Sequence, residues 1–442
     1  MEPLIHVDSK GEITPWLAES YKVADDLKSI TFTLRKGIKF HDGSDFNAKA
    51  AKWNLDNMLA TKSQPTWVSI DMIDDYTVRL NLSQWTNTIL TGLAGYPTYM
   101  VSPTAFQKNG ADWMRNNPVG TGPFKFVNFQ RDVVYKTVKN PDYWVTGKPY
   151  LDGVELLYVA DPLTQRAILL SGGTDVLQVE PGRVASELQS APGINTAISV
   201  TSTFILMPDT VHPDSPFAIQ KVREAVEYAI DREAIAKTFG YGYWQAPYQI
   251  PAPSSSAYNP NFTLGRKYDL AKAKQLLADA GYPNGFKATL LVIPVGIDKN
   301  IPIAIQSNLA QINIKLEVSI PAIIPKFLQD SNTMNSALLL EPIFGAGNWN
   351  SALSFALRPG LVNMNQVWLR TPEFTDLYNA TLASRSPDPK LIQAATDYLT
   401  KGAWVIPVLS GGSGYAMGNY VMDAGWFGRG SDWKPENTWL NK

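Results

Sequence analysis

The stretch that most constrains the fold of this chain runs from Ile30 to Leu59 and reads ITFTLRKGIKFHDGSDFNAKAAKWNLDNML. Its first five residues alternate apolar and polar side chains, which is the period of a half-buried strand. Ile38 and Phe40 continue that alternation after a glycine, so a second strand is predicted there. The sequence His-Asp-Gly-Ser at 41–44 then provides a turn, because Asp-Gly accepts positive φ at little cost.

A helix is predicted to follow this turn. Asn47 is a favoured N-cap residue, and Ala51, Leu55, Met58 and Leu59 recur at the spacing of one helical face. The stretch therefore reads as strand, strand, tight turn and capped amphipathic helix, which belongs to a mixed α and β domain.

Composition sets the size and excludes several chemistries. The 442 residues are enough for two or three domains. The net charge of -1 gives no reason to expect nucleic acid or a membrane surface as a partner. Because the chain has no cysteine, disulfides, thiolate metal sites and cysteine nucleophiles are excluded. No apolar run approaches the roughly 20 residues of a membrane-spanning helix.

The segment TFTLRKGIKFHDGSDFNA, preceded by LAESYKV, resembles the signature of extracytoplasmic solute-binding proteins of the peptide/nickel ABC-transporter family. Further segments resemble the same family and are spread along most of the chain. They are GTGPF at 120–124, NPDYW at 140–144, QRAILLSGGTDVLQV at 165–179, VREAVEYAIDREAI at 222–235 and YDLAKAKQLLADAGYPNGF at 268–286.

The resemblance implies an α/β (mixed α+β) chain with a two-lobed fold like that of periplasmic binding proteins, plus an extra small domain. We expect the small α+β domain at 1–116, a discontinuous large lobe at 117–203 and 405–442, and a second lobe at 204–404. Compared with the family, the chain starts inside the fold, so we expect an export signal and the first strand of the large lobe to be absent from it. Family members are extracytoplasmic, periplasmic or attached to the cell surface.

No residue pattern indicates catalysis, a metal or a cofactor. The three histidines, His6, His41 and His212, show no ligand-like spacing. The nucleophile elbow Gly-x-Ser-x-Gly is absent. Gly120 and Gly122 precede a predicted strand, whereas a phosphate loop is followed by Lys-Ser/Thr and a helix. We therefore predict a binding protein, with no cofactor and no metal.

The resemblance implies that the ligand binds between the lobes, and aromatic residues in predicted loops are candidates to cover it. The predicted ligand-binding residues come from the small domain, the crossing strands and two loops. They are Trp67, Thr203, Phe204, Tyr243, Trp244, Gln245, Phe344, Asn348, Trp349 and Ser410.

One segment departs from the family pattern. Peptide binders of the family carry an Asp after Gly-Trp that meets the ammonium group of a peptide, but residues 344–349 read FGAGNW. The preceding strand, 334–340, also lacks the Arg that some relatives use for a carboxylate. Because burying an unpaired ligand charge is costly, this departure favours a neutral ligand. Glu341 could replace the missing Asp from a position further upstream.

Four hypotheses remain open at this point. The chain could take up a peptide or similar small solute, or a neutral or sugar-like ligand, and deliver it to an ABC-transporter permease. A secreted glycan hydrolase is the alternative from another class, with Glu180 and Glu341 as candidate carboxylates. Finally, a chain without its first strand could fail to close on a ligand and need a partner. A monomer is expected, with a dimer as the alternative if the missing strand exposes sheet edges.

Overall fold

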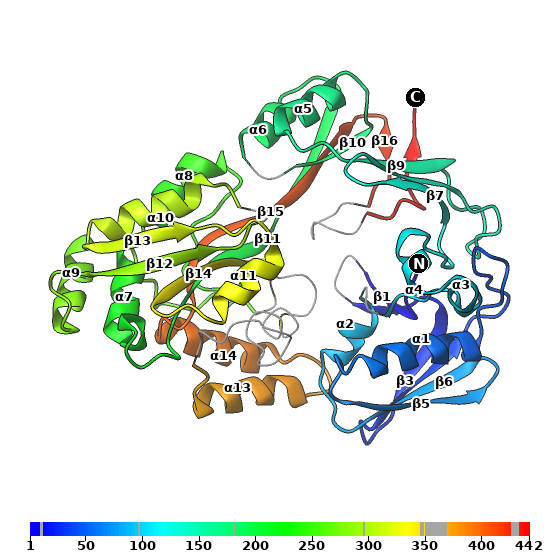
Figure 1. Cartoon of the computed structure of the whole chain (residues 1–442), viewed down its shortest axis with the longest axis horizontal. Helices are drawn as coiled ribbons and strands as arrows, with labels where there is room; N and C mark the ends of the chain where they lie inside the picture. Colours follow the sequence, from blue (N-terminus) through cyan, green and yellow to red (C-terminus); the bar gives the residue numbers. More distant parts are fainter. Residues whose placement is uncertain are drawn as a thin grey trace.

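The computed structural model describes residues 1–8, 12–95, 98–179, 182–253, 255, 257–294, 297–344, 349, 369–425 and 433–442. Strands and helices are mixed throughout, and the chain forms a ring of three regions in Figure 1. We keep the expected bounds as names for these regions: the small domain (1–116), the large lobe (117–203 and 405–442) and the second lobe (204–404).

The small domain is an antiparallel sheet covered by helices. The sheet has the order β3-β4-β6-β5, and β1 and β2 form a separate pair. Its strands are β1 (Ile5–Val7), β2 (Ile13–Pro15), β3 (Ala18–Val23), β4 (Ser29–Leu34), β5 (Trp67–Asp74) and β6 (Thr77–Leu82). Its helices are α1 (Ala48–Ala60), α2 (Ile89–Leu93), α3 (Pro103–Asn109) and α4 (Ala111–Asn116).

The signature stretch folds largely as its pattern predicts. Ile30, Phe32 and Leu34 of β4 are buried, and Asn47 caps α1 by accepting a hydrogen bond from the amide of Ala50 at 3.1 Å. Phe40 is buried as expected. The second strand does not form there, because the turn reverses the chain after an isolated bridge between residues 39 and 45.

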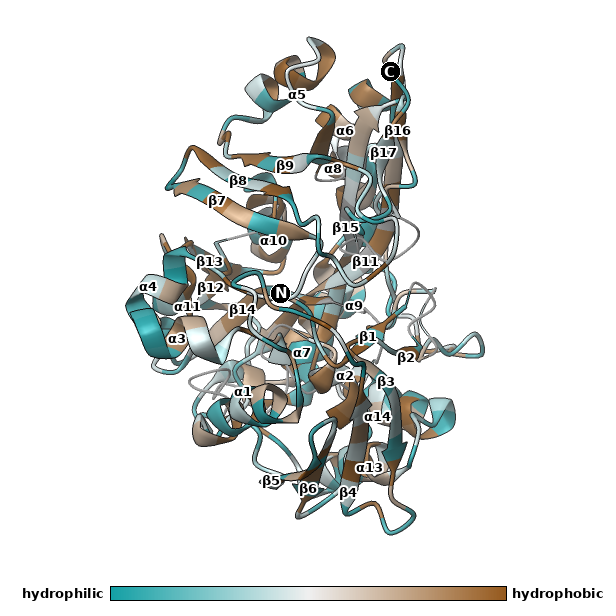
Figure 2. Ribbon diagram, turned by 90° about the vertical axis from the view of Figure 1, so that its right-hand side faces the viewer, coloured by the Kyte–Doolittle hydropathy of each residue, from teal (hydrophilic) through white to brown (hydrophobic). Residues whose placement is uncertain are grey.

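The large lobe begins with a three-stranded antiparallel sheet in the order β7-β8-β9. This sheet lies in the upper half of Figure 2, and the small-domain sheet lies in the lower half. The elements of this part are β7 (Phe124–Gln130), β8 (Val134–Lys139), β9 (Gly153–Leu157), α5 (Pro162–Leu170), β10 (Val176–Val179), α6 (Arg183–Gln189), β16 (Val421–Met422) and β17 (Trp439–Leu440).

A six-stranded sheet with the order β10-β15-β11-β14-β12-β13 runs from the large lobe through the second lobe. Two long strands, β11 (Ile194–Pro208) and β15 (Ile406–Gly418), make this continuity, and Figure 1 shows them crossing from one lobe to the other. The other strands are β12 (Phe286–Val292), β13 (Ile314–Ser319) and β14 (Ala337–Phe344). β12 pairs in parallel with both β13 and β14.

Helices cover both faces of the second-lobe sheet. On α7, Val222, Ala225, Val226 and Ala229 are buried and form one apolar stripe. The Asp231 side chain caps the following helix by accepting from the amide of Ala234. The helical elements are η2 (Pro216–Ala218), α7 (Gln220–Ala229), α8 (Arg232–Gly240), α9 (Leu270–Asp279), α10 (Asn300–Ala310), α11 (Ile324–Ser331), α13 (Pro372–Ala383) and α14 (Pro389–Lys401).

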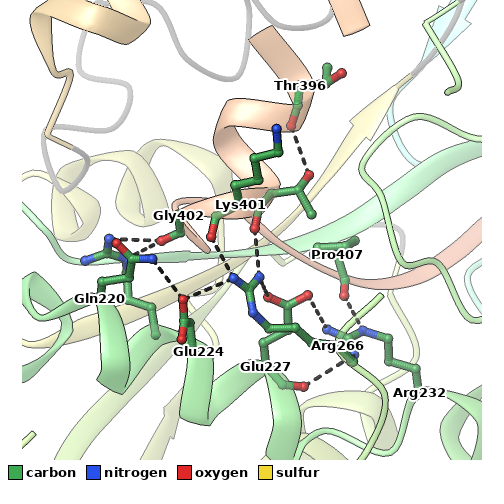
Figure 3. Close-up of polar contacts among 11 residues, drawn as sticks. Gln220, Glu224, Glu227, Arg232, Arg266, Thr396, Lys401, Gly402 and Pro407 are labelled. Atoms are coloured by element: carbon green, nitrogen blue, oxygen red, sulfur yellow. Dashed lines mark hydrogen bonds and ion pairs between the residues drawn. The ribbon is translucent and has the colours of Figure 1, made fainter. Parts of the chain in front are cut away.

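A buried ionic network fixes the start of β15 (Figure 3). The Glu227 carboxylate lies 2.8 Å from Arg266 and 3.4 Å from Arg232. Arg232 also donates to the carbonyl of Pro407, and Arg266 donates to the carbonyls of Thr400 and Lys401. Burial raises the pKa of Glu227, and the two arginines oppose that rise. The network therefore holds the end of α14 and the first residues of β15 against α7 and α8.

Candidate functional site

Two buried hydroxyl groups meet where the crossing strands run side by side. Thr203 of β11 and Ser410 of β15 are register partners, and their hydroxyl oxygens lie 3.1 Å apart. Both residues are almost completely buried, at 2% and 1% exposed. Register shifts lie on either side of this pair, between Val200 and Ser202 and between Phe204 and Ile205. The pair is therefore fixed between two local irregularities of the strand.

A carboxyl group lies on the same face of the sheet. Glu341 of β14 is the register partner of Ile205 and is 5% exposed. Side chains of register partners on antiparallel strands share a face, as do residues two apart on one strand. Thr203, Ile205 and Glu341 therefore face the same side, together with Ser410. We call Thr203, Glu341 and Ser410 the polar notch.

Trp349 belongs to the apolar surroundings of this face. It is buried in one cluster with Ile205 and Ile343. Its indole nitrogen is buried and has no hydrogen-bond acceptor in the part of the chain that the structure describes. A buried N–H without an acceptor is costly, and such groups are found where a ligand or water completes the bond. The indole N–H of Trp349 is thus a hydrogen-bond donor in the apolar cluster that lies on the same sheet face as the polar notch.

The loop after α8 is attached to the crossing strand. Gln245 and Ser410 form a backbone bridge with two hydrogen bonds of 2.9 Å. Before it, the Trp244 ring packs over Gly411, where a Cβ atom would come within 3.2 Å of the indole nitrogen. The backbone of Phe344 pairs opposite Ser202 on β11. Sequence-distant residues of the predicted set are therefore brought together at the crossing.

A cavity of about 320 Å³ borders the crossing at Gln245 and Ser410. The cavity is also lined by the loop that contains Pro247, Pro251 and Pro253, and Tyr248 and Lys267 contribute to its wall. Its size is at the lower end of the range for small-molecule sites. Neither Tyr248 nor Lys267 was among the predicted ligand-binding residues, because nothing in the local sequence distinguishes them from other loop residues.

Three predicted residues lie elsewhere. Trp67 is buried in the core of the small domain, and Phe204 is buried in the second-lobe core with Leu206. Tyr243 faces the large lobe, where its hydroxyl donates to the Gln189 side chain at 2.5 Å. The structure places these side chains apart from the polar notch, and a ligand role for them stays a prediction. Asn348 lies outside the described residues.

The described residues offer neither a metal-binding cluster nor a membrane-spanning helix. They contain no group of three or more His, Cys, Asp or Glu side chains that could hold a metal ion. None of the helices in this part of the chain is long and apolar enough to cross a membrane.

The fold is that of a two-lobed solute-binding protein. The DppA periplasmic binding protein of Helicobacter pylori, solved with the peptide STSA, superposes on this chain with a TM-score of 0.86 and 24% identity, covering 100% of this chain and 92% of that one. AgaA of A. tumefaciens R10, solved with agropinic acid, gives a TM-score of 0.84 and 27% identity with the same coverage.

Sequence comparison gives the family. Residues 12–336 match the model of the bacterial extracellular solute-binding proteins, family 5. The glutathione-binding protein GsiB of Shigella flexneri is 31% identical over 436 residues, which covers 92% of this chain and 82% of the relative. The chain belongs to family 5 of the bacterial extracellular solute-binding proteins, and it is a solute-binding component of an ABC importer.

Proposed function

We propose that this chain captures a short peptide or a glutathione-like solute at the polar notch and delivers it to an ABC permease. The observation that carries the proposal is the buried Glu341, which faces the same side of the sheet as the hydroxyl pair of Thr203 and Ser410. A carboxylate can meet the ammonium group of a peptide, and charge-assisted hydrogen bonds are the stronger kind. The relative GsiB, which is named for glutathione, supports this ligand class.

Glu341 therefore takes the place of the Asp that residues 344–349 lack. With one fixed carboxyl near the ligand, an ammonium group enters the site without an uncompensated burial of charge. The neutral-ligand hypothesis was based on the absence of a carboxyl group that could pair with a ligand's ammonium group. A ligand-facing role for Glu341 would supply that carboxyl group and weaken the argument for a neutral ligand. A glycan hydrolase requires two carboxyl groups facing each other across a cleft; of the two candidates, Glu341 lies on the sheet face described above, and Glu180 lies outside the described residues.

The experiment is isothermal titration calorimetry with reduced glutathione, the dipeptide Met-Leu and glucose. Glutathione or Met-Leu should bind, and glucose should not. Glu341→Gln and Thr203→Val keep the side-chain shape, and each should weaken binding at least tenfold, which corresponds to about 1.4 kcal/mol. Thr196→Val is the matched control, since Thr196 lies on the same strand opposite Ala416 and away from the notch.

Two results would contradict the proposal. Full affinity in Glu341→Gln would place the ammonium group elsewhere. Binding of glucose without binding of either peptide would support the neutral-ligand hypothesis instead. Agropinic acid is a useful further ligand for the titration, because AgaA was solved with it and is 27% identical to this chain.

A further inference from the structure

The small domain and the second lobe touch at a place far from the crossing strands in the fold. Asn87 of the small domain donates its side-chain amide to the carbonyl of Thr381 at 2.7 Å, and its backbone N–H to the carbonyl of Leu382 at 3.0 Å. Trp85 donates its indole N–H to the carbonyl of Ser384 at 3.1 Å. Figure 1 shows the end of α13 next to the small domain, on the other side of the ring from the crossing of β11 and β15.

The acceptors are the carbonyl groups at the end of a helix. α13 ends at Ala383, and the last four carbonyls of a helix have no partner within the helix. Here Thr381 and Leu382 supply two of them, and another domain supplies their donors. Asn87 is 4% exposed and Trp85 is 6% exposed, so water is excluded from these bonds. Nearby, Arg385 donates to the carbonyl of Val23 at 3.2 Å.

We propose that this contact is a latch, formed by Trp85 and Asn87 with residues 381–385, that holds the two lobes closed. In the chain, the small domain (1–116) reaches the second lobe (204–404) only through residues 117–203 of the large lobe, and the contacting residues are almost 300 positions apart. A movement of the second lobe about the crossing strands, with the small domain staying on the large lobe, would therefore separate Asn87 from α13. The latch stabilises the closed state without touching the ligand. The proposal rests on the proposed function in one respect only, which is the effect of the latch on ligand affinity.

The expected effect follows from the bonds that are lost. Each buried hydrogen bond contributes modestly, and a buried acceptor left without a donor is penalised further. Removing the Asn87 side chain breaks its bond to Thr381 and its 3.2 Å contact with the Ser384 hydroxyl. We expect Asn87→Ala to shift the ratio of closed to open molecules about tenfold toward the open form. The exposed pair of Arg385 and Asp25, at 4.0 Å, should contribute little.

The test measures the distance between the lobes in the ligand-free protein. The chain has no cysteine, so Lys49→Cys on α1 and Lys274→Cys on α9 give two unique, exposed labelling sites. Spin labels there report the distance distribution by double electron–electron resonance. The protein with an intact latch should give a narrow distribution, and Asn87→Ala should give one that is broader and shifted to longer distances.

The control is Asn81→Ala. Asn81 also donates side-chain hydrogen bonds, but to Ser69 and Asp71 within the small domain, so its loss should leave the distance unchanged. If Asn87→Ala does not fold, Trp85→Phe is the variant to test, because it removes the bond to Ser384 together with part of the indole ring and should lengthen the distance by a smaller amount. An unchanged distribution in the folded latch variants would overturn the proposal.

A second readout separates the latch from the ligand hypothesis. Where reduced glutathione binds, Asn87→Ala should weaken its affinity by up to about tenfold, because the binding-competent closed state is less populated. If glutathione does not bind at all, the ligand hypothesis fails, and the ligand-free distance still decides whether the latch exists.

Discussion

Removal of the Glu227 charge should sharply destabilise the second lobe. Its carboxylate is fully buried and lies between two arginines that are themselves 1% and 5% exposed. Breaking a buried ion pair on one side costs about 3–5 kcal/mol, because the partner charge is left uncompensated. Arg266 keeps Glu224 at 3.1 Å as a second partner. We therefore expect Glu227→Gln to lower the free energy of unfolding by about 3 kcal/mol, the low end of this range.

Hydrogen exchange measured by mass spectrometry tests this magnitude in one lobe of a multidomain chain. Exchange of the core amides of α7 and α14 reports the opening free energy of the second lobe. A loss of 3 kcal/mol corresponds to exchange that is about 150-fold faster. Amides of β4 and β6 in the small domain are the internal reference and should change little, because the network does not reach that domain.

Glu224→Gln is the matched control. Glu224 contacts the same arginine but is 21% exposed, and partly exposed pairs contribute about 1 kcal/mol or less. Equal exchange in Glu227→Gln and in the unmodified protein would refute the reasoning. It would mean that the carbonyl groups around Arg232 and Arg266 suffice to compensate both charges.

Three further predictions follow from other buried polar groups. Glu2→Gln should lower the melting temperature by several degrees, because the Glu2 carboxylate accepts four hydrogen bonds from side chains of the small domain and the large lobe; an unchanged melting curve would contradict this. Burial lowers the pKa of His41, whose ring bonds the Gly122 carbonyl at 2.9 Å. The unfolded chain therefore binds the extra proton first, and stability should fall as the pH drops below about 6.5. Chemical unfolding at pH 7.5 and 5.5 should show a smaller loss in His41→Gln, and an equal loss would exclude the histidine. Trp349→Phe removes the indole N–H together with part of the ring and should weaken ligand affinity about fivefold if a ligand accepts that bond; calorimetry that finds the original affinity would rule this out.

Local patterns predicted the parts of the fold that depend on neighbouring residues. The cap at Asn47 was identified from residue type, because an N-cap interacts with an amide three positions ahead. The buried stripe of α7 follows in the same way from its spacing. The strand predicted at Ile38 and Phe40 failed because the tight turn at 41–44, also recognised, leaves no room for a longer ladder.

The candidate site could be predicted only in part. Thr203 and Ser410 are 207 positions apart, and no local pattern reports their contact at 3.1 Å; the resemblance to the family suggested both. The same resemblance, combined with residue type, suggested Trp67, which the structure buries in the core of the small domain; a ligand role for it stays a prediction. A loop aromatic and a core aromatic look alike in a sequence, since burial depends on the chain that packs against it. The latch could not be predicted from the sequence either, because its residues are distant in the chain and only the folded structure brings them together.

The long strands β11 and β15 also determine the order in which the chain can fold during synthesis. β11 ends at Pro208, but its neighbour β15 begins only at Ile406. The small domain has all of its strands by Leu82, so it can fold while the rest is still being made. About 200 residues must be synthesised after β11 before its partner β15 is made, and until then the β15-facing edge of β11 is open to incorrect pairing. The six-stranded sheet, unlike the small domain, can therefore be completed only after β15 has been made, and a factor that holds the unfinished chain would protect β11 in particular.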